Sequence, residues 1–270
     1  MEVKYVNNNG VSVNLNKCPY KMLVSDLLDS EWECISSSDE ILEFRKKIQG
    51  KELKIDSLQG DGKKARENHS CLLDVFETDI IRKKPGKIYV DDYYMLCYIV
   101  KDIKNLWETS VVVSSEYSLV TDHPFWIREK RVTYERKQGE DNGYLDYPYD
   151  YPYDYSPNQT AVFIENTEIM PADFKMVIQG PCKNPEITIG DNKYQIVTEL
   201  SSYEYIVLNS IDRTAYKVSR NGLVTNVWAS LNRDYDNFAQ IPQGKHSIAT
   251  NGVFPLDITM YMKRSEPRWS

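Results

Sequence analysis

Apolar and polar residues alternate in short pieces over the first 35 residues of the chain. Residues 11–15 (VSVNL) are one instance. A period of two is typical of a strand that buries one face. Residues 7–10 (NNNG) lie between two such pieces and consist of turn formers. The pattern predicts short strands joined by tight turns.

Helical spacing begins near residue 40. Ser37 and Glu40 stand three residues apart, which is the spacing of a capping box at a helix N-terminus. Apolar residues at helical spacing follow as far as Gly50: Ile41, Leu42, Phe44 and Ile48. These signals predict a short amphipathic helix over 39–49.

A longer apolar stripe predicts a second helix over 65–79. Residues 85–86 (PG) would stop the helix beyond that point. Its members are Leu72, Leu73, Val75, Phe76 and Ile80. After that turn the pattern changes to short runs rich in β-branched and aromatic residues, spaced like neighbouring strands. These runs are KIYV, YYMLCYIV, SVVVSSEYSLV and RVTYE.

A break in composition lies between residues 137 and 160. It contains acids, prolines and glycines but no lysine or arginine, as expected of a boundary between domains. We therefore predict an N-terminal domain over 1–137, a connecting segment over 138–159, a second domain over 160–262 and a C-terminal tail over 263–270.

The second domain carries strand signals almost throughout, separated by turns such as residues 190–192 (GDN). Its runs are AVFIE, FKMVIQG, EITIG, YQIVTEL, EYIVLNS, TAYKVS, HSIAT and LDITMYM. Short strands at this spacing indicate a β-sandwich. Asn221-Gly222 predicts a hairpin with a type I′ turn, because both residues tolerate positive φ. The fold class is mainly β with a few short helices.

Composition adds a constraint on partners. The net charge is −7, and hydrophobic residues make up 41% of the 270 residues, enough to build buried cores. An acidic protein repels phosphate, so sequence-specific binding of nucleic acid is not expected. We interpret the basic groups at 63–66 (KKAR) and 82–84 (RKK) as solvated faces. The 20 tyrosines suit β-structure and shared surfaces.

The cysteines and the N-terminus bear on the compartment. Five cysteines lack CxxC spacing and have apolar neighbours, which predicts reduced core thiols made in a cytoplasm: Cys18, Cys34, Cys71, Cys97 and Cys182. Neither a signal peptide nor an apolar run of membrane-spanning length is recognisable, so we expect a soluble protein that is not exported by the general route.

Motifs for catalysis are missing from the sequence. His69, His123 and His246 fall in separate segments without metal-ligand spacing. No phosphate-binding loop or nucleophile elbow occurs. The carboxylate pairs at 91–92 and at Asp234 and Asp236 are interpreted as solvated turn residues. We predict no catalytic residue, no metal and no cofactor.

One aromatic group could bind sugar. Trp228 and Tyr235 could stack on a sugar ring, with Asn226 and Asp234 as hydrogen-bond partners. The interpretation that we prefer for Trp228 is a strand tryptophan buried between two sheets.

Residues 147–155 read YPYDYPYDY. In an extended strand the tyrosines would share one face, while the two prolines would remove donors from one lateral edge. Such a segment suits an edge strand or an arm laid on a surface, so we expect 144–156 to be an ordered interdomain strap; a flexible acidic linker is the alternative. The candidate surface consists of Tyr147, Tyr149, Tyr151, Tyr153 and Tyr155.

Several stretches, in their order and spacing, resemble the distal tail proteins of siphoviruses, often labelled phage tail family proteins. The stretches are 76–80 (FETDI), 85–90 (PGKIYV), 97–99 (CYI), 120–127 (VTDHPFWI), 147–155, 184–190 (NPEITIG), 238–244 (FAQIPQG) and 264–269 (RSEPRW). The resemblance covers nearly the whole chain.

This resemblance implies a structural virion protein at the distal end of a phage tail, made and assembled in the host cytoplasm. The N-terminal domain would form a homo-hexameric ring, or belt, between the tail tube protein and the tail-associated hub protein, with a galectin-like sandwich outside it. Receptor-binding or side-fibre proteins are further partners, and DNA would pass through the ring without specific binding. No membrane contact and no enzymatic activity are implied.

Two other function classes remain open. In one, the sandwich at 160–262 is a carbohydrate-binding module that recognises host surface glycans through Trp228 or nearby tyrosines. In the other, the protein is an enzyme that acts on cell-wall sugar. The sugar-site residues of true galectins have no clear copy in this sequence, so the sandwich could serve as a docking surface alone.

Overall fold

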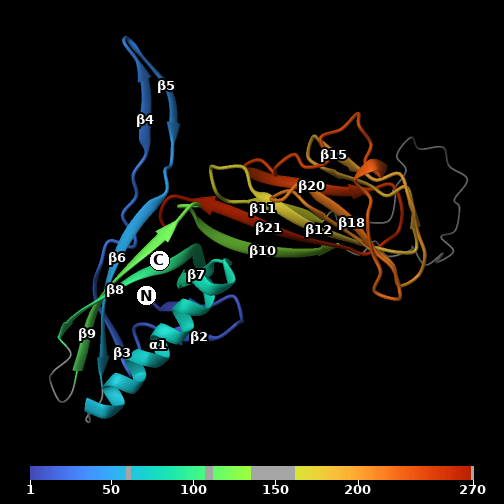
Figure 1. Ribbon diagram of the computed structural model, residues 1–270. Helices are drawn as coiled ribbons and strands as arrows, with labels where there is room; N and C mark the ends of the chain where they lie inside the picture. The colour runs from blue at the N-terminus through green and yellow to red at the C-terminus, as the bar shows by residue number, and fades with distance from the viewer. Residues whose placement is uncertain (59–61, 107–111, 135–161, 269–270) are drawn as a thin grey trace, which may run out of the picture. The chain divides into compact units, whose positions relative to one another are not determined.

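The computed structural model describes residues 1–58, 62–106, 112–134 and 162–268 (Figure 1). The chain divides into two compact units, Met1–Arg128 with Lys263–Ser270 and Glu129–Met262. Strands dominate both units, and the described residues contain one α-helix and one short 3-10 helix. The expected class, mainly β with few helices, is confirmed.

Unit 1 is built on antiparallel strands in the order β2–β1–β7–β8–β9–β6–β3. The long strand β8 pairs with β7 through its first residues and with β9 through its later ones, so it belongs to two parts of a bent sheet. The strands are β1 (Val3–Val6), β2 (Ser12–Asn14), β3 (Tyr20–Ser25), β6 (Gln49–Leu58), β7 (Gly86–Val90), β8 (Tyr93–Leu106) and β9 (Val112–Thr121).

The helix α1 (Gly62–Arg82) packs against β6, β8 and β9 of this sheet (Figure 1). The helix expected over 65–79 is thus confirmed and extends further at both ends. Its residues Leu72 and Phe76 are buried, and the Phe76 ring meets those of Tyr5 and Tyr117 edge-on, at centroid distances of 4.9 and 5.4 Å. Edge-on aromatic pairs add about 0.5–1.5 kcal/mol beyond the area they bury, so this aromatic cluster fixes α1 on the sheet.

The helix expected over 39–49 is wrong. The segment forms a two-stranded hairpin of β4 (Glu33–Ser37) and β5 (Glu40–Arg45), which extends away from the rest of unit 1 (Figure 1). Ser37 and Glu40 pair across a two-residue turn, so the spacing of the capping box is also the spacing of a tight hairpin. Every residue of β5 is exposed, so no buried surface was available to stabilise an amphipathic helix here.

A β-bulge explains why the apolar residues of this strand have the spacing of a helix. Cys34 pairs with Phe44 and Ser36 with Ile41, so the register shifts by one residue at Leu42. Directly opposed residues share a face, so the bulge places Ile41 and Phe44 on the same face although they stand three residues apart. That interval also matches one helical turn.

Unit 2 is a β-sandwich with a buried core between two antiparallel sheets. One sheet has the order β10–β21–β12–β17–β18–β19 and the other β11–β20–β14–β15; β13 and β16 form a separate pair. The strands are β10 (Trp126–Tyr134), β11 (Phe163–Asn166), β12 (Asp173–Gln179), β13 (Cys182–Lys183), β14 (Glu186–Ile189), β15 (Asn192–Gln195), β16 (Glu199–Leu200), β17 (Tyr205–Asn209), β18 (Thr214–Val218), β19 (Val224–Asn226), β20 (Gly244–Thr250) and β21 (Leu256–Arg264).

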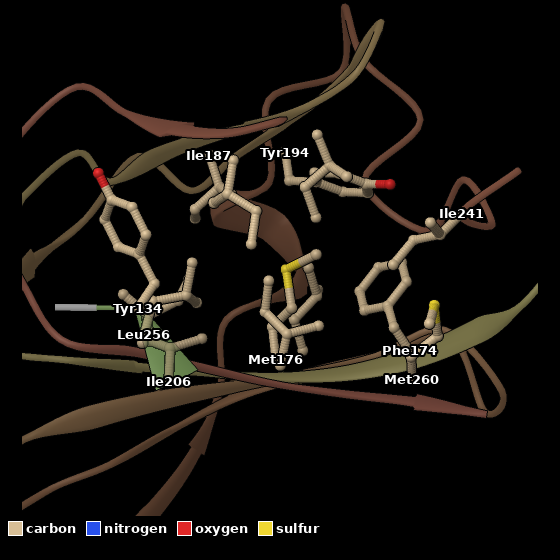
Figure 2. Close-up of a cluster of buried hydrophobic side chains, with 14 of the residues drawn as sticks. Tyr134, Phe174, Met176, Ile187, Tyr194, Ile206, Ile241, Leu256 and Met260 are labelled. Atoms are coloured by element: carbon tan, nitrogen blue, oxygen red, sulfur yellow. The ribbon is translucent and has the colours of Figure 1, made fainter. Parts of the chain in front are cut away.

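The sandwich core is filled by side chains from both sheets. Figure 2 shows Ile187 and Tyr194 on one side facing Met176, Ile206 and Leu256 on the other. Phe174 and Tyr194 pack edge-on at 5.1 Å between ring centroids, and the Tyr194 hydroxyl donates to the Ala239 carbonyl at 2.8 Å. The buried phenol is therefore satisfied, as a dry core requires.

The hairpin predicted at Asn221-Gly222 joins β18 to β19, but its turn is not type I′. Only Gly222 has positive φ (+81°), and the Gly222 N–H bonds the Ser219 carbonyl at 2.8 Å. The loop is longer than two residues, because Ser219 also donates to the Leu223 carbonyl at 2.9 Å. Asn221 contributes through its side chain, which accepts from the Leu223 N–H at 3.1 Å.

The cysteines are only partly the core thiols that the sequence indicated. Cys97 is buried, and burial raises the pKa of its thiol. Cys182 is half-buried, with its pKa raised by burial to about 11. Cys18, Cys34 and Cys71 are exposed. Apolar sequence neighbours did not identify their faces: Cys34 lies on the projecting hairpin and Cys71 on the outer side of α1.

Candidate assembly surfaces

The tyrosines of the predicted strap, Tyr147, Tyr149, Tyr151, Tyr153 and Tyr155, lie outside the residues that the structure describes. The proposed role of 144–156 therefore stays a prediction. The other predicted aromatic residues, Trp228 and Tyr235, lie in the described part of unit 2.

Trp228 is not buried between sheets, and the interpretation we preferred is wrong. It begins the 3-10 helix η1 (Trp228–Ser230), which Val227 joins to the edge strand β19, and 55% of its surface is exposed. Asn226 fixes this turn by accepting from the Trp228 N–H at 2.8 Å. Because the preceding strand lies at a sheet edge and is exposed throughout, the ring has no opposing sheet to cover it.

Tyr235 is half-buried and lies beneath the Lys193 ammonium, 5.7 Å from the ring centroid. No aromatic pair joins it to Trp228 in the described part of the chain. Of the two proposed hydrogen-bond partners, Asn226 is engaged by the turn and Asp234 is exposed. The structure therefore leaves Trp228 as the single exposed ring of this set.

The residues considered for catalysis or metal binding make structural contacts with the backbone. Asp91 accepts from the Glu2 N–H at 2.7 Å, and Asp236 accepts from the Phe238 N–H at 3.1 Å. His246 faces the Pro242 carbonyl at 3.2 Å. No group of three or more potential metal ligands occurs among the described residues. In that same portion, no helix has the length and apolarity needed to cross a membrane.

A buried polar cluster holds the N-terminal strands on α1. Asp79 is fully buried and accepts from the Tyr5 hydroxyl and from the Asn8 N–H, both at 2.7 Å, and from the Asn8 side-chain amide. Burial is the main cause that raises the pKa of Tyr5, so this phenol remains a donor. Gly86 passes so close that a Cβ there would lie 2.3 Å from both the Asp79 carboxylate and the Tyr5 hydroxyl.

This cluster gives a structural role to two of the stretches that carry the family resemblance. Asp79 belongs to FETDI and Gly86 to PGKIYV. Both residues serve packing within unit 1, because the carboxylate is satisfied and closed to solvent. We assign them no binding role.

The projecting hairpin has one apolar face. The strand register and its bulge place Cys34, Phe44 and Ile41 on this face, and Trp32 directly precedes β4. Exposed fractions are 43% for Trp32, 58% for Phe44 and 58% for Ile41, while the bulged Leu42 is 60% exposed. We call these residues, Trp32, Cys34, Ile41, Leu42 and Phe44, the hairpin apolar face.

The opposite face of the hairpin is charged. Glu33 contacts Lys47 at 2.5 Å and Arg45 at 2.9 Å. Hydrogen bonds from Lys47 and then Arg45 lower the pKa of the Glu33 carboxyl. Exposed ion pairs contribute little free energy, and their charged groups are stable in contact with water. The charged face therefore needs no partner, whereas an exposed apolar face is typical of an interaction site.

The base of the hairpin packs against the rest of unit 1. The Trp32 ring meets Phe125 at 6.1 Å between centroids, and the Lys46 ammonium lies 5.2 Å from the Trp32 centroid. Lys51 is buried beside them and donates to the Asp26 carbonyl at 3.0 Å. An open cleft of about 710 Å³ lies here, lined mainly by residues 29–34 and 47–51. These contacts anchor the hairpin at its root and leave its outer part uncovered.

Comparison of the sequence with protein-family models and with curated proteins finds no match. Solved structures do match. The crystal structure of the Dit protein of phage SPP1, described as a paradigm of the hub adsorption apparatus in phages that infect Gram-positive bacteria, superposes with a TM-score of 0.62. The identity is 10%, and the match covers 97% of this chain and 99% of that chain.

Chains of the phage p2 baseplate in its activated conformation match similarly. The structure with Ca gives a TM-score of 0.61 at 12% identity, and that with Sr gives 0.62 at 13% identity; each match covers 98% of this chain and 99% of the other. The resemblance to siphovirus distal tail proteins is therefore confirmed at the level of the fold, which this chain shares from one end to the other with SPP1 Dit and a p2 baseplate chain.

Proposed function

We propose that this protein is a structural component of a phage tail tip. The observation that carries the proposal is the extent of the structural match, which includes both units and almost every residue of the chains compared. A single shared sandwich would be weak support, because sandwiches host many functions. Two different units in the same order are a more specific signature.

In this role the N-terminal unit assembles into a hexameric ring that joins the tail tube protein to the tail-associated hub, and the galectin-like sandwich docks other tail proteins. A ring repeats one heterologous interface, so each copy gains two neighbours and modest contacts give a closed assembly. The protein works through assembly and performs no catalysis. Its place is the distal end of the tail in the virion.

The test has two parts. Light scattering on the purified full-length protein should give a mass of several copies at micromolar concentration, and negative-stain images should show a ring with a central hole. Antibody labelling of intact particles should mark the tail tip. A protein that stays monomeric at high concentration, or a label elsewhere on the particle, would overturn the proposal.

The exposed Trp228 supports a second candidate, a carbohydrate-binding module. A solvent-exposed ring is what stacking on a sugar requires. On a glycan array, this candidate predicts binding by the full-length protein that Trp228→Ala abolishes. The matched control is Tyr203→Ala, because Tyr203 is 75% exposed on the same unit. Absence of glycan binding, or equal loss in both variants, would reject the candidate.

A further inference from the structure

The sandwich of unit 2 has an edge strand that the chain does not protect. Sheet edges expose unpaired N–H and C=O groups, and proteins usually cover them with loops or guard them with charged residues and proline. In the described part of unit 2, β19 pairs only with β18, and every residue of β19 is exposed. Residues 221–228 (NGLVTNVW) contain neither a charged residue nor a proline.

Two other edge strands of the same sandwich are protected. On β15, the Gln195 N–H donates to the Asn237 side chain at 2.6 Å, and its carbonyl accepts from the Asn232 N–H at 3.0 Å, so the loop after η1 covers this edge. On β11, the Glu165 carbonyl accepts from the Lys130 ammonium at 3.4 Å. The open edge is therefore particular to β19 and is not a general property of the sandwich.

The ladder between β18 and β19 determines which backbone groups point outward. The Val227 N–H donates to the Ala215 carbonyl of β18 at 3.0 Å. Backbone groups alternate sides from one residue of a strand to the next, so Val224 and Asn226 direct their N–H and C=O groups away from β18. These groups can bond one further strand.

Apolar side chains surround this edge. Leu223 and Val224 are each 60% exposed, and Trp228 is 55% exposed. Val224 pairs with Val218, which pairs with Tyr205, so an apolar row crosses the outer face of the sheet as far as its edge. Because every second side chain of an added strand would extend this row, the edge suits an extended segment with apolar residues.

A cation beside the edge indicates the charge of such a segment. Residues 214–232 contain two basic residues and no acid. Lys217 is paired with Glu204 at 2.7 Å. Arg220, in the turn before β19, is exposed and lies 5.2 Å from the centroid of the Tyr203 ring, without a carboxylate partner among the described residues. An acid opposite Arg220 would complement this charge.

We propose that β19 is a docking edge, which accepts an extended segment of another tail protein as an additional antiparallel strand. The backbone of the segment bonds to Val224 and Asn226, its apolar side chains cover Leu223 and Val224, and an acid near its C-terminal end meets Arg220. Antiparallel pairing continues the ladders of β17, β18 and β19. The inference rests on the proposed function, because it names the surface through which the sandwich would dock another tail protein.

A peptide of defined composition tests the proposal on the full-length protein. The probe is a fluorescein-labelled peptide of alternating valine and threonine that ends in two glutamates. One control peptide has methylated backbone nitrogens and so lacks the donors, and a second ends in two lysines. Fluorescence anisotropy measures the binding of each peptide, and amide hydrogen exchange locates it.

Val224→Pro removes one outward N–H and leaves the ladder to β18 intact. The matched control is Phe163→Pro on the edge strand β11, where Phe163 is 45% exposed. The Phe163 N–H also points outward, because the preceding Val162 accepts from the Ile248 N–H of β20. A thermal unfolding scan checks that each variant folds.

The wild type and Phe163→Pro should bind the probe equally, and Val224→Pro should bind it at least about tenfold more weakly, as should the wild type with the methylated peptide. Arg220→Glu should weaken binding of the glutamate peptide and strengthen that of the lysine peptide. In the wild type, the probe should slow exchange of the Val224 and Asn226 amides. This exchange measurement decides the question if Val224→Pro does not fold.

No binding by the wild type, unchanged binding in Val224→Pro or equal loss in Phe163→Pro would overturn the inference. A second copy of this chain is the other possible occupant, and light scattering without peptide would reveal it as a lower mass for Val224→Pro than for the wild type. The proposed function has its own test in the labelling of particles. A labelled tail tip without peptide binding would reject the docking edge alone.

Discussion

Gly86 shows how one position without a side chain holds unit 1 together. The Asp79 carboxylate and the Tyr5 hydroxyl leave no room for a Cβ, and both groups are buried and bonded to each other. We expect Gly86→Ala to lower the free energy of unfolding by about 1–3 kcal/mol, because the cluster must shift to admit a methyl group.

Chemical denaturation of the full-length protein measures this effect. The matched control is Gly50→Ala, another strand glycine, whose added Cβ would meet only the Leu119 carbonyl at 3.9 Å. The control should change stability by less than about 0.5 kcal/mol. Equal effects in the two variants would show that the cost comes from the strand backbone and not from the buried cluster.

His69 makes unit 1 sensitive to acid. It is buried, its Nδ1 lies 3.0 Å from the Tyr117 hydroxyl, and its Nε2 lies 3.2 Å from the Asp102 carboxylate. Burial lowers the pKa of His69 more than the nearby Asp102 raises it. The unfolded state therefore binds a proton at a higher pH than the folded state does, and stability is lost as the pH falls below about 6.5.

The test compares wild type with His69→Gln, which cannot be protonated. Thermal midpoints measured between pH 7.5 and pH 5 should fall more steeply for the wild type, and the two curves should converge toward acid pH. Parallel curves would mean that protonation of His69 is not coupled to folding. The comparison removes the contribution of the carboxylates, since both proteins contain the same ones.

At the scale of elements, the sequence predicted most strands and the helix α1, because alternation and the stripe of Leu72 and Phe76 reflect a buried face. It failed at the hairpin β4–β5. Ser37 and Glu40 fit a capping box as well as a tight turn, and the bulge at Leu42 gave a strand the spacing of a helix. The local pattern alone could not distinguish a helix from a hairpin here, because the segment is exposed and its apolar residues do not mark a buried face.

The turn between β18 and β19 allows a prediction about a single element. Gly222 has φ of +81°, and nothing lies within 4 Å of the position where its Cβ would be. Gly222→Ala should therefore destabilise the protein by about 1 kcal/mol through backbone strain alone. Gly252→Ala is the control, because that glycine lacks positive φ and its Cβ would meet only ordinary contacts with Phe254. Similar unfolding midpoints for the two variants would contradict this account.

On the scale of the whole molecule, the candidate surfaces were harder to predict than the fold. Exposure of Trp228 depends on β19 being an edge strand, and strand order is not visible in a single sequence. Three residues of the hairpin apolar face, Ile41, Leu42 and Phe44, were predicted to form the apolar side of a helix. The break in composition after residue 137 also did not reveal that β10, which precedes it, contributes to unit 2, because its partner β21 lies far along the chain.

The pairing of β10 with β21 leads to a prediction about the residue at which a stable fragment of unit 2 must begin. Tyr134 is 9% exposed and belongs to the sandwich core (Figure 2). Thr133 donates to the Asp257 carboxylate at 2.6 Å, and Arg131 pairs with it at 3.0 Å. A fragment that begins at residue 129 keeps these contacts, whereas one that begins at 138 exposes the edge of β21 and part of the core.

We expect the fragment 129–262 to unfold in one cooperative transition and the fragment 138–262 to be less stable by at least about 3 kcal/mol, since it loses a large buried aromatic residue and a paired strand. Circular dichroism during thermal unfolding measures both. Tyr134→Ala in the longer fragment separates the two contributions, because it empties the core position and keeps the strand. Equal stability of the two fragments would show that β10 adds nothing to the sandwich, and the unit would then begin after the break in composition.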